Sequence, residues 1–155
     1  MSRWDALRPR VAHLLLALWW GGFTFYSTVV VSVGTEVLHS ATKQGFITQQ
    51  VTLYLNALAG LALAAVLWEL WARRQAGQGR RLAEIAWLVA VVALLAQVVV
   101  HGRMTALLDV PHREVLEEVL FYRFHRLYLC LASAQWLASF ILLLGCFHAP
   151  RPPVP

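Results

Sequence analysis

Four long runs of apolar residues, separated by short polar segments, make up most of the chain. The runs are Val11 to Val33, Val51 to Trp71, Ile85 to Val100 and Leu127 to Phe147. A hydrocarbon core of about 30 Å needs roughly 20 helical residues, and the third run reaches that length once Ala83 and Met104 are included. The pattern predicts an all-α fold, an integral membrane four-helix antiparallel bundle, with spans at about 11–33, 48–71, 83–104 and 121–147.

The polar segments between these runs predict a single four-span domain covering residues 1–155. We expect a short first loop at 40–47 and a plain turn at 73–81. In the third connection Pro111 marks a break, and the following segment REVLEEVLFYRFHR is predicted to be a helix that lies in the membrane interface before it enters the fourth span. The proline-rich end, 148–155, is predicted to be a flexible tail.

Composition and charge support a membrane protein and give its orientation. Of the 155 residues 59% are hydrophobic and 14% charged, and the mean hydropathy is +0.61, a balance unlike that of a soluble domain. The net charge is +5, and eight of the thirteen Lys and Arg residues fall on the side that carries both termini. The positive-inside rule then predicts cytoplasmic termini in a multi-pass protein of the bacterial inner membrane. The positive charge is thus a topology signal and does not indicate nucleic-acid binding.

Small residues predict the inward face of each span, because helices in lipid pack through Gly, Ala, Ser and Thr. The predicted stripe of span one is His13, Ala17, Gly21, Thr24, Thr28, Ser32 and Thr35, and that of span two is Asn56, Gly60, Ala64 and Trp68. Span three gives Ala86, Ala90, Ala93, Gln97 and His101, and span four gives His125, Ala132, Gln135, Ser139 and Cys146. Residues at the span boundaries are predicted to form the aromatic belts: Trp68, Trp71, Trp87, Tyr122 and Tyr128.

Histidines on these stripes are the main candidates for function, because protonatable or ligating side chains inside a membrane bundle are costly. His101 ends span three and His125 opens span four, so both belong to the outer rim. His39 joins them if the first helix continues outward, and Glu36 precedes it at the E-x-x-H spacing that can present a carboxylate and an imidazole to one metal. His13 lies at the opposite rim, roughly 25 to 30 Å from His101 in depth, and cannot share one iron with it.

Polar neighbours extend this candidate site. Gln97, one turn below His101, and Asn56, in the outer half of span two, are expected to form hydrogen bonds behind the ligands. Arg103 and Arg123 could neutralise the propionates of a haem or hold an anionic substrate. The alternative interpretation is that the histidines anchor helix ends at the interface and that the arginines extend to lipid headgroups.

Three segments resemble the four-helix membrane families typified by HemJ-like protoporphyrinogen oxidases and CopD-like copper-resistance domains. They are VAHLLLALWWGGFTFY in span one, VVVHGRM at the end of span three and FYRFH at the start of span four, the last similar to uncharacterised four-span relatives. In HemJ-like members the first-helix histidine is associated with haem binding, which the resemblance carries over to His13 alone. The chain departs from those oxidases in having EVLHSATKQG where they have a long basic segment, and in lacking a lysine within span three.

These features leave three hypotheses for function. The first is a haem- or metal-binding membrane redox protein, with haem b or a transition metal ion as cofactor and a quinone or other membrane subunits as partners. If it acts on a substrate, it is a membrane oxidoreductase. The second is a non-catalytic structural subunit of a larger membrane complex. The third is a small transporter, which ranks lowest because no span is broken and no acidic residue is expected within the apolar core.

Overall fold

The computed structural model describes residues 3–78, 80–109 and 114–147. Its helices are α1 (Arg3–Phe25), η1 (Tyr26–Val30, a π-helical segment), α2 (Val31–Leu38), α3 (Ala41–Gln75), α4 (Arg81–Thr105) and α5 (Glu118–Phe147). Two short strands, β1 (Leu108–Asp109) and β2 (Glu114–Val115), pair between α4 and α5. The predicted break at Pro111 and the predicted tail at 148–155 lie outside the described residues.

Four helices are long and apolar enough to cross a membrane, which confirms the all-helical prediction with four apolar helices. They are Leu7–Leu38, Ala41–Gln75, Arg81–Thr105 and Glu118–Gly145. The first is continuous through α1, η1 and α2, so it extends beyond the predicted end of span one near residue 33.

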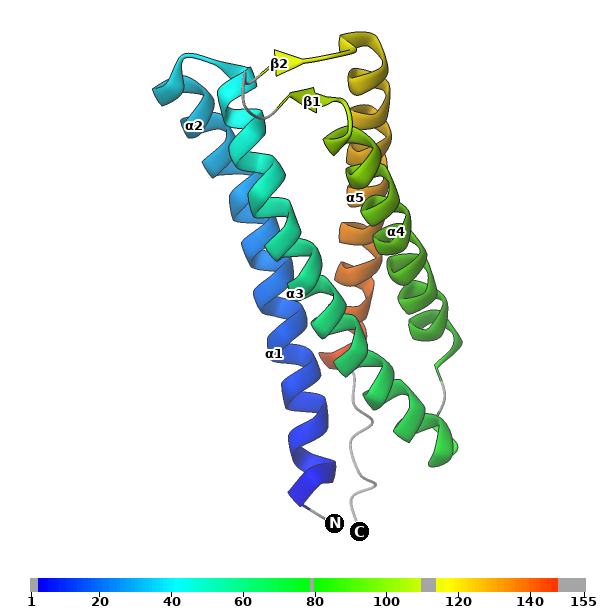
Figure 1. Cartoon of the computed structure of the whole chain (residues 1–155). Coiled ribbons are helices and arrows are strands. Elements are labelled where there is room, and N and C mark those ends of the chain that lie inside the picture. The colour runs from blue at the N-terminus through cyan, green and yellow to red at the C-terminus, as the bar shows by residue number, and fades with distance from the viewer. Residues whose placement is uncertain (1–2, 79, 110–113, 148–155) are drawn as a thin grey trace.

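The helices lie side by side along one axis (Figure 1). We call the end that holds the start of α1, the turn between α3 and α4 and the end of α5 the lower end, and the end that holds α2, β1 and β2 the upper end. The most extensive packing is between α4 and α5 and between α1 and α3, and contacts between α3 and α4 join the two pairs. At the upper end β1 pairs antiparallel with β2, and the amide of Leu116 donates to the Leu107 carbonyl at 2.9 Å.

Two of the connections between the helices differ from the predictions. The predicted loop at 40–47 is wrong, because α3 begins at Ala41. His39 ends α2 with a left-handed φ of 46°, and the Ser40 side chain caps α3 by accepting a hydrogen bond from the Lys43 amide, so two residues complete the turn. The predicted interfacial helix is also wrong at its start, because residues 114–115 form β2 and α5 begins at Glu118.

Packing confirms the predicted inward faces of spans three and four. On α4 the buried side chains include Ala86, Ala90, Ala93 and Gln97. On α5 they include Ala132, Gln135 and Ser139. Because these small residues recur at spacings of three or four, the two helices can approach each other closely along most of their length.

The predicted inward faces of spans one and two are partly wrong, although Thr24 and Asn56 do accept hydrogen bonds from side chains of α5. The buried residues of the first span are Ala12, Leu16, Trp19 and Tyr26, and those of α3 include Ala59, Ala62, Leu63 and Val66. Several residues of the predicted stripes are exposed instead: Ala17, Gly21, Thr28, Ser32, Ala64 and Trp68. The reason is local, since the hydroxyls of Thr28 and Ser32 donate to carbonyls four residues earlier and need no partner on another helix.

Candidate functional site

His101 lies half-buried near the upper end of α4, beside a polar side chain from each of two other helices. Its ring centroid is 6.4 Å from that of Tyr128 on α5. The Tyr128 hydroxyl donates to Asn56 Oδ1 on α3 at 3.3 Å. Nearby, Gln49 on α3 donates to the Thr105 hydroxyl on α4 at 3.1 Å. We call His101, Tyr128 and Asn56 the upper cluster.

For Tyr128, a member of the upper cluster, the sequence pattern predicted the wrong location. It was expected in an aromatic belt, yet it is 8% exposed and forms a hydrogen bond inside the bundle. The other predicted belt tyrosine, Tyr122, is exposed, as expected. The spacing from Tyr128 to Gln135, seven residues, places both on one helix face, and this spacing was the signal that could have identified it.

His125 occupies the same face of α5 about one helical turn from Tyr128, roughly 4.5 Å along the axis. It is half-buried, and its ring stacks on Phe121 with centroids 6.3 Å apart and an interplanar angle of 5°. Among the described residues, no side chain or backbone group forms a hydrogen bond with the imidazole nitrogens of His101 or His125. These nitrogens therefore remain available to a ligand.

His39 and Glu36 lie apart from this pair. Both are exposed on the α2 segment, where the His39 amide donates to the Glu36 carbonyl at 3.2 Å, and α2 packs against α3. In the part of the chain that the structure describes, no three His, Cys, Asp or Glu side chains lie close enough to hold a metal ion. The structure therefore does not assemble the four predicted metal ligands, His101, His125, His39 and Glu36, into one group.

Gln97 forms its hydrogen bonds with groups other than His101. Its amide donates to Gln135 Oε1 at 2.5 Å and to the Ala93 carbonyl at 3.3 Å, so it connects α4 to α5 below the upper cluster. Gln135 Nε2 and Ser139 Oγ are buried with no partner among the described residues. Of the two residues expected behind the ligands, only Asn56 reaches the surroundings of His101, through Tyr128.

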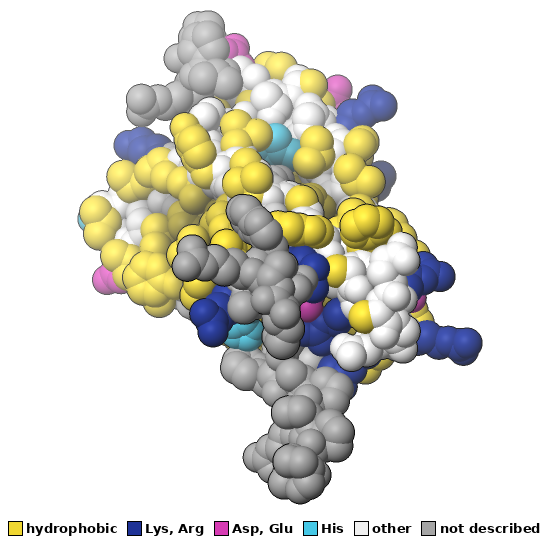
Figure 2. All heavy atoms as spheres, turned by 90° about the horizontal axis from the view of Figure 1, so that it is seen from below, with side chains coloured by type: hydrophobic (Ala, Val, Ile, Leu, Met, Phe, Trp, Pro, Cys, Tyr) yellow, Lys and Arg dark blue, Asp and Glu magenta, His cyan; other side chains and the backbone are white. Residues whose placement is uncertain are grey.

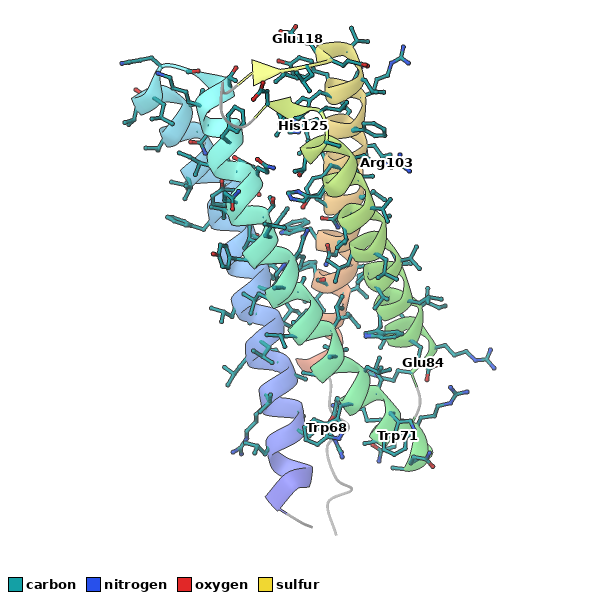
Figure 3. All side chains as sticks on the ribbon, viewed as in Figure 1. Trp68, Trp71, Glu84, Arg103, Glu118 and His125 are labelled. Carbon is teal, nitrogen blue, oxygen red and sulfur yellow. The ribbon has the colours of Figure 1, made fainter. Side chains whose placement is uncertain are left out.

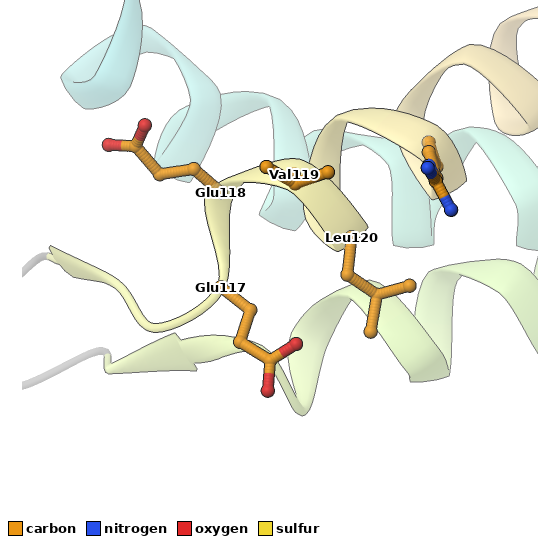
Figure 4. A pocket seen from close by; sticks show the side chains of 5 residues that line it. Glu117, Glu118, Val119 and Leu120 are labelled. Carbon is orange, nitrogen blue, oxygen red and sulfur yellow. The ribbon is translucent and has the colours of Figure 1, made fainter.

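The two arginines predicted to hold an anionic group are exposed at the upper end. In Figure 3 the Arg103 side chain extends outward from α4, away from the bundle. Arg123 lines an open hollow of about 410 Å³ at the start of α5, together with Glu117, Glu118 and Leu120 (Figure 4). Whether either arginine contacts a bound anion stays a prediction.

The lower end holds an acidic residue that the sequence interpretation missed. Glu69 on α3 is only 6% exposed, and its carboxylate accepts hydrogen bonds from Nε of Arg8 on α1, at 2.7 Å, and from Nε of Arg73. Because Glu69 lies at the lower end of the predicted second span, the expectation of no acidic residue within the apolar core stays a prediction. The signal was the spacing of Ala62, Val66 and Glu69 on one helix face, but its partner Arg8 comes from another helix.

His13 also belongs to the lower part of α1, where it is half-buried. Figure 2 views this end from below and shows Lys and Arg side chains gathered around it. Because α1 begins at the lower end, His13 lies on the part of the first span that is farther from the upper cluster.

No family model, curated protein or solved structure matches the chain. The resemblance to HemJ-like and CopD-like families, and the role it implies for His13, therefore stay predictions. What the chain does must be argued from its own geometry.

Proposed function

We propose that the chain is a multi-pass membrane protein, an antiparallel four-helix bundle whose lower end faces the cytoplasm. The four apolar helices support this, and so do large apolar side chains on their outer faces, such as Leu14 (67% exposed) and Leu95 (62% exposed). Because cytoplasmic loops are enriched in Lys and Arg, the arginines of the α3–α4 turn, Arg73, Arg74, Arg80 and Arg81, favour this orientation in a bacterial inner membrane.

We further propose that the upper end binds a redox cofactor through His101 and His125. The observation that carries this proposal is the pair of half-buried imidazoles on two neighbouring helices, with nitrogens that no described residue engages. Protonatable side chains on the inner face of a membrane bundle are usually kept for function, and imidazole is a common ligand of haem and metal ions. The Tyr128 ring lies beside His101, and the hydrogen bond from Tyr128 to Asn56 holds that ring in place.

Two imidazoles suit haem b better than a bare transition metal ion. A haem needs one or two axial ligands from the protein, whereas zinc and copper sites take three or four protein ligands. Bound there, a haem would supply one-electron transfer. The residues of this chain would hold the iron and, through Arg103 or Arg123, the propionates. Exchange of electrons with a quinone or another membrane subunit is the function that this location favours.

Histidine substitutions test this assignment with controls from the same chain. The His101→Ala and His125→Ala variants are each expected to lose most of the visible absorption of the purified protein, because each removes a side chain that would hold the iron. The His39→Ala variant is the matched control, since His39 is exposed on α2, and is expected to keep that absorption. The His13→Ala variant tests whether His13, to which the family resemblance gives a haem-binding role, also contributes to the absorption.

Two results would overturn the proposal. Unchanged absorption in both His101→Ala and His125→Ala would exclude the pair as ligands. Equal loss in the His39→Ala control would show that the absorption follows general stability and not ligation. Circular dichroism of each variant reports whether the helices remain intact.

A structural subunit of a larger membrane complex is the second candidate. It is favoured by Gly21, Thr28 and Ser32, small side chains that face outward on the first span, where a helix of another protein could approach closely. A protein that purifies alone, monodisperse and coloured would count against this candidate.

A further inference from the structure

Three arginines lie near the buried carboxylate of Glu69 at the lower end of the molecule. Arg8 comes from α1, Arg73 and Glu69 from α3, and Arg80 is the N-cap residue of α4. We call these four residues the lower arginine cluster. Arg73 and Arg80, which both line the cleft described below, together carry one formal charge more than Glu69. The proposed redox site, at the other end of the molecule, makes no use of it.

The hydrogen bonds within the cluster leave some N–H donors of Arg73 and Arg80 available to a ligand. The carboxylate accepts from the Nε atoms of Arg8 and Arg73, one at each oxygen, so Glu69 does not engage the terminal nitrogens of Arg73. Arg80 Nη1 donates to the Gly145 carbonyl at the end of α5, at 2.8 Å. A guanidinium has five N–H donors arranged to bind carboxylate or phosphate oxygens, so these contacts do not exhaust the donors of Arg73 or Arg80.

A small cleft opens among these groups. It holds about 30 Å³ and is lined by residues of all four long helices, including Ala12, Glu69, Arg73, Arg80 and Gly145. That volume admits a water molecule or one phosphate oxygen. A larger ligand would have to lie at the mouth of the cleft and insert a single oxygen between the arginines.

The depth of the cluster matches that of lipid phosphates. Trp68 and Trp71, on the same helix as Glu69 and Arg73, are 44% and 61% exposed at the lower end (Figure 3). Tryptophan side chains favour the level of the headgroups. Leu67, 45% exposed and next to Trp68, offers apolar surface for an acyl chain just above.

We propose that the lower arginine cluster binds the phosphate of an anionic phospholipid of the inner leaflet. The proposal rests on the membrane embedding proposed above and is independent of the cofactor. The excess positive charge favours a lipid with a net negative charge, whereas a zwitterionic headgroup brings its own cation and gains less. Glu69 binds both Arg8 and Arg73 and holds Arg73 beside the cleft, and Arg80 completes the site from α4.

The test measures the thermal unfolding midpoint of the full chain in neutral detergent with added phosphatidylglycerol, phosphatidylcholine or inorganic phosphate. A ligand that binds only the folded state raises the midpoint. We expect phosphatidylglycerol to raise it by several degrees and phosphatidylcholine to have little effect. The Arg80→Gln variant keeps the Arg8–Glu69–Arg73 network and is expected to lose most of this shift. The matched control, Arg81→Gln, changes the neighbouring exposed arginine and is expected to keep it.

Three outcomes would overturn the proposal. Equal shifts from the two lipids would show that no charge is recognised, and equal losses in Arg80→Gln and Arg81→Gln would show diffuse surface attraction. A full shift from inorganic phosphate alone would make the ligand a free anion and not a lipid. Failure of the embedding itself is measured separately, because an embedded chain leaves the membrane fraction only with detergent. The visible absorption of Arg80→Gln reports the cofactor site independently.

Discussion

Tyr128 connects the helix that carries His125 to α3 through a single hydroxyl. Its bond to Asn56 is partly buried, and its ring lies near that of His101. Tyr128→Phe keeps the ring and removes only the hydroxyl, which leaves Asn56 Oδ1 without this donor. A buried hydrogen bond contributes about 0.5 to 1.5 kcal/mol, so we expect the free energy of unfolding in detergent to fall by an amount in that range.

The control for this substitution lies on the same helix. Tyr122 is 59% exposed, so Tyr122→Phe is expected to leave the free energy of unfolding nearly unchanged. Equal effects of the two substitutions would contradict the placement of Tyr128 inside the bundle and return it to the aromatic belt. The comparison is made by denaturant unfolding followed by circular dichroism.

At the scale of elements, the bond between Gln97 and Gln135 is the main polar contact in the middle of α4 and α5. Gln97→Leu leaves both ends of the Gln135 amide without a described partner, because Gln135 Nε2 already has none. Interhelical hydrogen bonds in membranes contribute about 0.6 kcal/mol on average and at most about 1.7. We expect Gln97→Leu and Gln135→Leu each to destabilise the chain, and the double variant to be more stable than the sum of the two losses predicts.

A double-mutant cycle measures this coupling through the unfolding free energies of the four forms. Additive losses would show that the two amides do not interact in the membrane. Gln50→Leu, at an exposed position of α3, is the control for replacing glutamine with leucine.

The inward faces of α4 and α5 could be predicted because alanines at helical spacing leave room for a neighbouring helix. The face of the first span could not, because a Ser or Thr hydroxyl can bond either across an interface or to its own backbone. Thr28 and Ser32 take the second course. Glu69 was missed for a related reason, since its burial depends on Arg8, which is 61 residues away in the chain.

At the same scale, the sequence located His101 and His125 at one end of the molecule, and the structure leaves both half-buried there. It could not show that His39 and Glu36 lie apart from them, because that separation follows from the direction of α2 and its packing against α3. The role of Tyr128 depended on its distance to Asn56, which no local pattern contains.

For the whole molecule, the membrane orientation gives a prediction about accessibility. In a chain whose native Cys130 and Cys146 are replaced by Ser, Thr42→Cys at the upper end is expected to react with an impermeant maleimide in intact cells. Gln78→Cys, in the turn between α3 and α4, is expected to react only after permeabilisation, because the arginines beside it favour the cytoplasm. The reverse pattern would invert the orientation, and reaction at both sites in intact cells would contradict the spanning arrangement.

The central claim, a redox cofactor held by His101 and His125 at the upper end, is tested most directly by the visible absorption spectrum of the purified wild-type protein, recorded oxidised and then after chemical reduction. A haem with two imidazole ligands gives a strong absorption band that shifts and sharpens on reduction, and this is the result we predict. A colourless protein, with no absorption in either state and no bound transition metal by elemental analysis, would contradict the claim.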